Sequence, residues 1–306
     1  MTVLEAIQKS ADFLAKKGVE SPRLQTELLL AHLLKLPRVK LYLNFERVLT
    51  PVETDALREL VKRRGQREPL QHITGSTSFC GLEVAVNRHA LVPRPETELL
   101  AELGWQFLQG RAGSPQPAAN GRADLPVGQD AQQRVPTESA SALDLGTGTG
   151  CIAIALAVKC PAARIMATDV STDALALAKE NAAQIGVAGQ IEFLQGDGFA
   201  ALQNVRFDLI ISNPPYIPSA EIAALQPEVR DSEPRNALDG GADGLDFYRW
   251  IASQAATFLK PGGKIMLEIG DGQAEAVRRI FENEKWIVEA VKEDYSQRER
   301  ILIARR

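Results

Sequence analysis

The sequence lacks the features that mark several large classes of protein. Its 306 residues include three cysteines and three histidines, with no C-x-x-C pair and no metal-ligand spacing, so we expect reduced thiols and no metal site. No apolar run approaches the roughly 20 residues of a membrane span. The first residues read as an amphipathic helix without a signal-peptide pattern. These absences favour a cytoplasmic protein with no membrane contact.

A basic excess is also missing. The chain has 35 Lys and Arg against 39 Asp and Glu, a net charge of −4, whereas proteins that grip phosphate backbones are usually basic. One local basic cluster contains Lys62, Arg63, Arg64 and Arg67. Its simplest interpretation is the solvated C-terminus of a helix, where cations suit the helix dipole. We therefore expect no stable binding of nucleic acid.

The patterns that are present divide the chain into three parts. Residues 1–74 show helical periodicity alone, with helix starts at Ser21-Pro22, a serine N-cap, and at Thr50-Pro51-Val52-Glu53, a capping box. Residues 75–96 predict a β-hairpin that turns at Gly81 and leads into an extended segment fixed by prolines. Residues 97–306 form the third part. Their stretch at about 110–139, rich in Gly, Pro, Ala and Gln, is interpreted as a flexible insertion without a catalytic role.

After Ser141 the pattern alternates between strands and helices, which predicts an α/β fold. Such alternation is typical of a Rossmann-like, mostly parallel sheet with helices on both faces. The last two expected strands have no helix between them, so one of them should run antiparallel. The expected strands are 141–145, 164–169, 190–195, 207–212, 263–269, 286–292 and 299–304, and the expected helices lie near 149–160, 171–186, 245–259 and 271–284.

A glycine-rich turn follows the first of these strands, in Leu143 to Gly150. Glycines allow a sharp turn and a close approach of the backbone to a ligand, and Asp169 lies at the distance expected for a ribose-binding acid. These features fit NAD or S-adenosylmethionine. The Gly-x-Gly-x-Gly spacing, and Asp144 placed to hold a cationic methionine moiety, favour S-adenosylmethionine; Asp197 is placed to accept a hydrogen bond from an adenine amino group. The predicted cofactor-binding residues are Gly146, Thr147, Gly148, Thr149, Gly150, Asp169, Asp197, Gly198 and Asn213.

Asn213-Pro214-Pro215-Tyr216 follows the fourth expected strand. An sp² nitrogen that carries two hydrogens could donate one to the Asn213 side-chain oxygen and the other to the Pro214 carbonyl. The prolines stiffen that carbonyl, and Tyr216 could stack on the planar acceptor. We therefore predict a methyl acceptor of the amide or exocyclic-amine type, with Asn213, Pro214 and Tyr216 as catalytic residues and Asn213, Pro214, Pro215 and Tyr216 as substrate-binding residues.

The chain resembles the bacterial N5-glutamine methyltransferases of peptide chain release factors, the HemK-type family. The resemblance covers nearly the whole chain and rests on Val92 to Glu98, the glycine turn, Asn213 to Tyr216, and Asp294-Tyr295 with Arg298 to Arg300. It implies a class I S-adenosylmethionine-dependent methyltransferase with a seven-stranded sheet. It also implies that the helical domain docks a class 1 release factor and that the glutamine of the Gly-Gly-Gln motif is the acceptor. We expect the enzyme to be a monomer.

The sequence departs from the family at two points and leaves other functions open. The insertion at 110–139 is longer than usual, and Gly198 stands where relatives often carry an aromatic residue that Phe199 could replace, unless Phe199 belongs to the core. Arg94 and Glu268 are expected near the cleft, with packing or salt bridges as their simplest role. The alternatives are an N6-adenine or other exocyclic-amine methyltransferase on nucleic acid, glutamine methylation of another translation protein, and a non-enzymatic or redox protein on the same fold.

Overall fold

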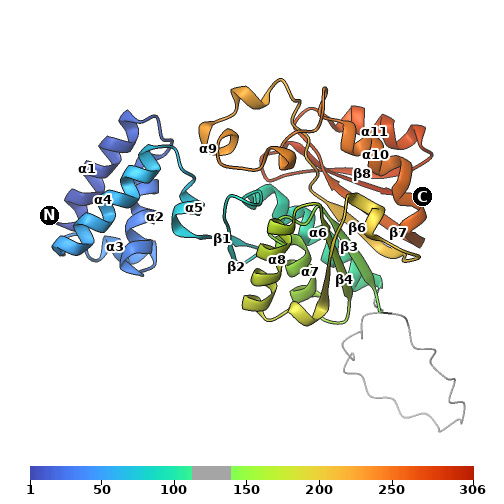
Figure 1. Cartoon of the computed structure of the whole chain (residues 1–306), viewed down its shortest axis with the longest axis horizontal. Helices are drawn as coiled ribbons and strands as arrows, with labels where there is room; N and C mark the ends of the chain where they lie inside the picture. Colours follow the sequence, from blue (N-terminus) through green and yellow to red (C-terminus); the bar gives the residue numbers. More distant parts are fainter. Residues whose placement is uncertain (112–138) are drawn as a thin grey trace, which may run out of the picture.

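The computed structural model describes residues 1–111 and 139–306 (Figure 1). The insertion expected at about 110–139 therefore lies largely outside the described residues. The chain begins with a helical bundle of α1 (Val3–Lys16), α2 (Pro22–Leu34), α3 (Arg38–Tyr42), α4 (Pro51–Gly65) and α5 (Leu70–Thr74). The bundle has its own apolar core, in which Ile7, Leu29 and Leu57 are buried. Among the described helices, none combines the length and the apolar character needed to cross a membrane.

Two helix starts test the capping predictions. The capping box is confirmed, because the Thr50 side chain accepts from the backbone N–H of Glu53 while the Glu53 side chain accepts from that of Thr50. Ser21 holds the predicted N-cap position before Pro22, but its backbone is left-handed (φ 47°) and its side chain does not make the expected capping hydrogen bond. Pro22 starts the helix, because its ring fixes the φ that the first helical residue requires.

A hairpin connects the bundle to the rest of the chain. Strands β1 (Ser76–Phe79) and β2 (Leu82–Ala85) pair antiparallel through a two-residue turn, in which Cys80 and Gly81 both have positive φ. This conformation matches the twist of a tight hairpin. Asn181 then fastens the hairpin, because its side chain accepts from the N–H of Ala85 and donates to the Ala85 carbonyl. The hairpin is thus held against helix α8 (Thr172–Ile185) of the following α/β part.

The α/β part, residues 95–306 as far as they are described, contains one seven-stranded sheet of order β5-β4-β3-β6-β7-β9-β8. Strand β9 is antiparallel to both of its neighbours, so the predicted single reversal is confirmed. The strands are β3 (Ser141–Leu145), β4 (Arg164–Asp169), β5 (Ile191–Gln195), β6 (Phe207–Ser212), β7 (Leu259–Glu268), β8 (Ile287–Glu293) and β9 (Glu299–Arg305). The helices are α6 (Pro95–Arg111), α7 (Cys151–Lys159), α8 (Thr172–Ile185), α9 (Pro227–Arg230), α10 (Asp246–Gln254) and α11 (Ala274–Asn283), with short 3₁₀ turns at Ala188–Gln190, Gly198–Ala201, Ile222–Ala224, Arg235–Ala237 and Ala255–Phe258.

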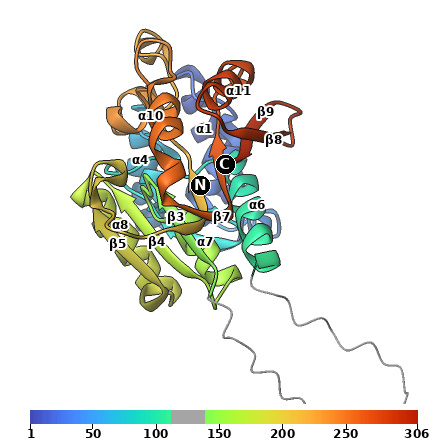
Figure 2. The same cartoon turned by 90° about the vertical axis from the view of Figure 1, so that its right-hand side faces the viewer.

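Alternate residues of the central strands face different helix layers. In β3, Ala142 packs into the core beneath α6, α7 and α8, while Leu143 packs beneath α10 and α11. Strands buried on both faces read as continuous apolar runs, which is why β6 has the sequence Phe-Asp-Leu-Ile-Ile-Ser with every residue buried. In both views α10 and α11 lie above α6 and α7, with the strands between them (Figures 1 and 2).

A charged cluster joins the helical bundle to the α/β part. Arg64, nearly buried at the end of α4, donates to Glu228 Oε1 at 2.7 Å, and Arg67 donates to both Glu228 oxygens at 2.7 and 2.6 Å. Glu228 belongs to α9, which lies on the side of the α/β part that faces the bundle (Figure 1). The interpretation of the basic cluster as a solvated helix end is therefore wrong for Arg64 and Arg67. A charge that is paired across two parts of the chain cannot be recognised from local sequence.

The ionisation of Glu228 depends on this cluster. Burial opposes its charge, but the hydrogen bonds from Arg67 and Arg64 outweigh that effect and lower the pKa of Glu228 to about 2. A carboxylate with a depressed pKa stabilises the fold above its unfolded pKa of 4.5 and loses that contribution as the pH falls towards 2.

We expect Glu228→Gln to lower the free energy of unfolding by about 3 kcal/mol, because it leaves the buried Arg64 guanidinium without its counter-ion. Urea unfolding at pH 7 measures the change, and the gap to the parent protein should narrow between pH 4.5 and 2. Asp231→Asn is the control, since the Arg230–Asp231 pair on the same segment is exposed and should contribute little to the free energy of unfolding. Equal stability of the two variants would show that the pairing of Arg64 and Arg67 with Glu228 does not stabilise the fold.

Candidate active site

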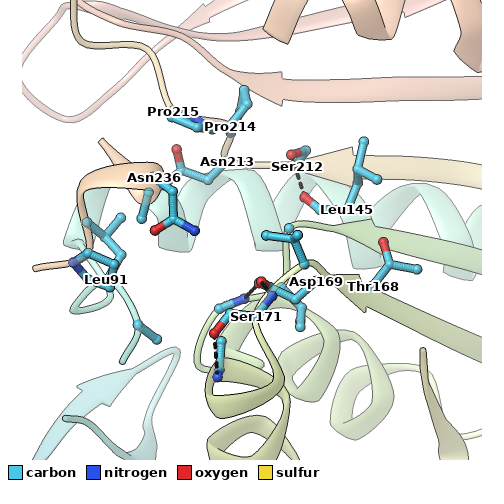
Figure 3. Close-up of a pocket in the computed structure, with 18 of the residues that line it drawn as sticks. Leu91, Leu145, Thr168, Asp169, Ser171, Ser212, Asn213, Pro214, Pro215 and Asn236 are labelled. Carbon is cyan, nitrogen blue, oxygen red and sulfur yellow. Dashed lines mark hydrogen bonds between the residues drawn. The ribbon is translucent and has the colours of Figure 1, made fainter. Parts of the chain in front are cut away.

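A cavity of about 200 Å³ opens at the carboxyl ends of β3, β4 and β6. In Figure 3, Asn213, Pro214 and Pro215 lie on one side of it, and Asp169 and Ser171 lie on the opposite side. Most of the predicted site residues line this one cavity, although Gly150 and Tyr216 do not. Those that do are Gly146, Thr147, Gly148, Thr149, Asp169, Asp197, Gly198, Asn213, Pro214 and Pro215.

The glycine turn is fastened to the end of β4. Gly146, Gly148 and Gly150 all have positive φ (73°, 57° and 81°), a backbone conformation that glycine adopts without strain. The N–H groups of Gly146 and Thr147 donate to the Thr168 carbonyl, each at 2.9 Å, and that of Gly148 donates to Asp169 Oδ2 at 2.9 Å. Gly150 does not line the cavity. It is the N-cap residue of α7, and a Cβ at this position would lie 3.0 Å from the Ala178 Cβ. Three hydrogen bonds from its backbone N–H groups therefore fasten the turn to Thr168 and Asp169.

Asp144 does not occupy the place predicted for it. It is fully buried beneath the turn and absent from the cavity wall, where its Oδ2 accepts from the Thr147 hydroxyl at 2.6 Å and from Ala153 N at 3.1 Å. Burial raises the pKa of Asp144 to about 7 against the effect of these hydrogen bonds. Its Oδ2 holds the turn and the first turn of α7, while its Oδ1 is buried without a hydrogen-bond partner among the described residues. The carboxylate does not line the cavity, so this geometry gives no direct contact with a cationic ligand there.

Asp169 and Asp197 both line the cavity, but they differ in how many hydrogen bonds the protein makes to their carboxylates. The Asp169 carboxylate accepts from Gly148 N and, at 2.9 Å, from Ser171 N, so backbone groups fix its orientation at the end of β4. Asp197 is exposed, and its side chain has no hydrogen-bond partner among the described residues. The Thr168 hydroxyl between them is buried and also unpartnered. This wall therefore offers two carboxylates and a hydroxyl with free hydrogen-bonding capacity.

An aromatic side chain closes the cavity beside Gly198. A Cβ on Gly198 would lie 1.8 Å from Trp250 Cη2, so the Trp250 ring occupies the space that a side chain at 198 would fill. Phe199 is 3% exposed and stacks between Trp250 and Phe258, with ring centroids 4.9 and 4.8 Å away. Phe199 is thus a core residue. The aromatic surface at this end of the cavity comes from Trp250 of α10.

The Asn213 loop presents unused acceptors to the cavity. The Asn213 side-chain N–H₂ donates to the Thr97 hydroxyl at 3.2 Å, which leaves its Oδ1 without a partner among the described residues. The Pro214 carbonyl also accepts no hydrogen bond from the part of the chain that the structure describes. Neighbouring Ser212 anchors the end of β6 by donating to the Leu145 carbonyl at 2.6 Å (Figure 3). Two residues that line the cavity, Asn213 and Pro214, therefore each carry an oxygen acceptor without a partner among the described residues.

Tyr216 lies elsewhere than the stacking prediction requires. A Cβ on Gly270 would lie 3.1 Å from the Tyr216 ring, and the Tyr216 hydroxyl lies 3.4 Å from Glu268 Oε1. Burial raises the pKa of Tyr216, and the Glu268 carboxylate adds to the effect. Stacking of Tyr216 on the acceptor stays a prediction that this arrangement does not support.

Two charged residues near the cavity have defined partners. Arg94 lines the cavity and donates to both oxygens of Glu233, at 2.7 and 2.8 Å, while Glu233 itself is buried. Glu268, 1% exposed at the end of β7, accepts from the Thr97 hydroxyl at 2.7 Å. The predicted loop-fixing salt bridge is confirmed for Arg94. For Glu268 the partner is a hydroxyl that also contacts Asn213.

Sequence reasoning missed several lining residues. Trp250, Phe247 and Ile251 come from one helix, and Asn236 comes from a 3₁₀ turn far along the chain from the other site residues. None of them belongs to a motif, and their arrival at the cavity depends on how the chain crosses the sheet. Thr97, which contacts Asn213, lies within the proline-rich run at Val92 to Glu98, and that motif was the sequence signal that could have pointed to it.

Comparisons with known proteins agree with this geometry. Residues 5–75 match the family described as PrmC N-terminal domain, and residues 131–228 match that described as Methyltransferase small domain. The release factor glutamine methyltransferase of Geobacter sulfurreducens is 45% identical over 280 residues, covering 92% of this chain and 88% of that protein. The chain belongs to the release factor glutamine methyltransferase family. The relative from Moorella thermoacetica is 38% identical over 312 residues, covering 100% and 99% of the two chains.

A solved structure supports the fold of this methyltransferase. The human METTL16 catalytic domain, solved with an RNA hairpin, superposes with a TM-score of 0.50 at 14% identity, covering 83% of this chain and 81% of that one. At that identity the likeness shows the class I methyltransferase fold alone.

The residues present fit S-adenosylmethionine. The turn at Gly146 to Gly150 leaves room for a close ligand, Asp169 and Asp197 offer acceptors, and the buried Thr168 hydroxyl lacks a partner. Trp250 adds an apolar aromatic ring to the cavity wall against Gly198, which suits a purine ring.

We expect Gly198→Ala to weaken the binding of S-adenosylhomocysteine about tenfold, because a side chain there must displace the Trp250 ring. Isothermal titration measures the affinity. Gly186→Ala is the matched control, since Gly186 also has a positive φ (86°, against 58° at Gly198) but has nothing within 4 Å of an added Cβ. Equal affinities of the two variants would show that Trp250 does not shape the cofactor site.

Proposed function

We propose that this methyltransferase transfers a methyl group to the side-chain amide nitrogen (N5) of the glutamine in the Gly-Gly-Gln motif of class 1 peptide chain release factors. The products are N5-methylglutamine and S-adenosylhomocysteine. The observation that carries the proposal is the pair of unpartnered acceptors, Asn213 Oδ1 and the Pro214 carbonyl, on the wall of a cavity shared with the glycine turn. Family membership supports the choice of a release factor.

The two acceptors match the two hydrogens of a primary amide. With one N–H held by Asn213 Oδ1 and the other by the Pro214 carbonyl, the nitrogen lone pair would point into the cavity. When bound, S-adenosylmethionine supplies an electrophilic methyl group and leaves as a neutral thioether. The amide nitrogen forms the new N–C bond as the S–C bond breaks, and it then loses one N–H proton to water. Acceptors on both hydrogens stabilise the positive charge that develops on the nitrogen.

The helical bundle is the proposed docking site for the release factor. Its attachment supports this role, because Arg64 and Arg67 tie the bundle to Glu228, and Glu233 in the same segment contacts the cavity residue Arg94. A protein bound to the bundle would therefore sit next to the segment that borders the cavity. We propose a monomeric enzyme that acts in the cytoplasm.

The deciding experiment is methyl transfer from labelled S-adenosylmethionine to a panel of acceptors. The panel contains a purified class 1 release factor, its Gly-Gly-Gln glutamine-to-alanine variant, a ribosomal protein mixture, and adenine-containing DNA and RNA. We expect label on the intact release factor alone. Label on nucleic acid would instead favour an exocyclic-amine methyltransferase, and label on the glutamine-less factor would move the acceptor to another residue.

Two variants should separate acceptor positioning from cofactor binding. Asn213→Ala should lower kcat at least about 100-fold with little change in cofactor affinity, because it removes an oriented acceptor. Asp169→Ala should mainly weaken cofactor binding, because the carboxylate that lines the cavity is lost. Turnover and calorimetry on both variants provide the comparison. Near-normal turnover by Asn213→Ala would refute the positioning role, and unchanged affinity in Asp169→Ala would remove Asp169 from the cofactor site.

A further inference from the structure

The amide of Asn213 is held from behind by two residues of other elements. Thr97, in the first turn of α6, is 3% exposed, and its hydroxyl lies 3.2 Å from Asn213 Nδ2 and 2.7 Å from Glu268 Oε2. Glu268 ends β7 and is 1% exposed. The three side chains form one line that runs from the core to the cavity wall.

The direction of these hydrogen bonds follows from the number of hydrogens available. A hydroxyl has a single hydrogen, and Thr97 gives it to the Glu268 carboxylate, which can only accept. Towards Asn213, Thr97 can therefore only accept, so the amide must turn its N–H₂ to Thr97 and its oxygen to the cavity. A flipped amide would place Asn213 Oδ1 against the Thr97 oxygen, so two hydrogen-bond acceptors would face each other. It would also turn its N–H₂ towards the nitrogen that is to be methylated, and an N–H₂ group cannot accept a hydrogen bond from that nitrogen.

We propose that Thr97 and Glu268 are positioning residues that fix the amide orientation of Asn213. This inference rests on the proposed function, in which Asn213 Oδ1 holds one hydrogen of the acceptor nitrogen. Thr97 and Glu268 act through Asn213 and do not themselves touch the reacting atoms. They select one of the two otherwise similar orientations of an asparagine side chain.

The protonation state of Glu268 controls this selection. The groups that face it are Thr97 and Glu96 on α6, the Tyr216 hydroxyl, and Arg300 on β9, while the Tyr248 hydroxyl of α10 donates to its backbone carbonyl. Burial raises the pKa of Glu268 to about 7, against the opposing effects of the Thr97 hydrogen bond and Arg300. A protonated Glu268 can donate to Thr97, which then can donate to Asn213 Oδ1 and favour the flipped amide. The active form is the carboxylate, so kcat should fall as the pH drops below about 7.

The test compares Thr97→Val, which keeps the shape and removes the hydroxyl, with Thr97→Ser, which keeps the hydroxyl. With a class 1 release factor as acceptor, Thr97→Val should lower kcat at least about tenfold with unchanged KM and cofactor affinity, and Thr97→Ser should stay within about threefold. Thr26→Val is the control for losing a buried threonine hydroxyl, since Thr26 is 0% exposed and donates to the Pro22 carbonyl in the helical bundle. Equal kcat losses in Thr97→Val and Thr97→Ser, or in Thr97→Val and Thr26→Val, would overturn the proposal.

Glu268→Gln supplies a second readout. It should remove the fall in kcat between pH 8 and 6 while the melting temperature stays the same or rises, because a neutral side chain no longer has to be buried as an ion. In the parent protein, the NMR signals of the Asn213 side-chain N–H₂, assigned through their loss in Asn213→Ala, should shift with a midpoint near pH 7. Signals that do not titrate, or that titrate equally in Glu268→Gln, would overturn the proposal. This NMR test needs no methyl acceptor, so its result is independent of the proposed substrate. Failure of the parent enzyme to label the release factor would refute only the proposed function.

Discussion

The pairing of β3 with β4 on one side and β6 on the other is the constraint on which the rest of the structure depends. The three strands are parallel, so their carboxyl ends meet at one edge and bring the glycine turn, Asp169 and Asn213 together. After β3 the chain enters α7 on one face of the sheet, while after β6 it crosses to α10 on the other face. Connections that leave neighbouring strands towards opposite faces open a crevice between them, and the cavity lies there.

The two ends of β6 show how the same sheet separates packing from chemistry. Near its first residue, Asp208 accepts from Arg111, Lys260 and the backbone and hydroxyl of Ser141, and these bonds lower its pKa to about 2 despite burial. That carboxylate has its hydrogen-bonding capacity filled by the chain. Beyond its last residue, Asn213 and Pro214 carry oxygens that the described chain leaves free. Strong internal satisfaction marks a structural group, and rigid but unsatisfied acceptors mark a binding group.

Local chemistry decided which parts of this structure could be predicted. The strand–helix alternation, the single reversed strand and the Thr50 capping box depend on neighbouring residues, and all three predictions hold. The motif residues came to one cavity because each of them follows a strand. The Asp144 prediction failed although the partners of this residue are local, because Thr147 and Ala153 satisfy its Oδ2 beneath the turn. The other failures depend on residues far apart in the sequence: Arg64 pairs with Glu228, and Trp250 reaches Gly198. No pattern within a window of sequence contains those distances.

The segment from α9 to the following 3₁₀ turn is fastened to two other parts of the molecule. Glu228 holds it to the helical bundle, and Glu233 holds it, through Arg94, to the extended segment between the hairpin and α6. The bundle is consequently not an independent module in an evolutionary sense, although it has its own core. A chimera that exchanged the bundle between relatives would have to preserve the arginine pair at positions 64 and 67, or exchange α9 together with it. Because Arg64 and Arg67 share the carboxylate of Glu228, a substitution at any of the three positions changes the partners left for the other two.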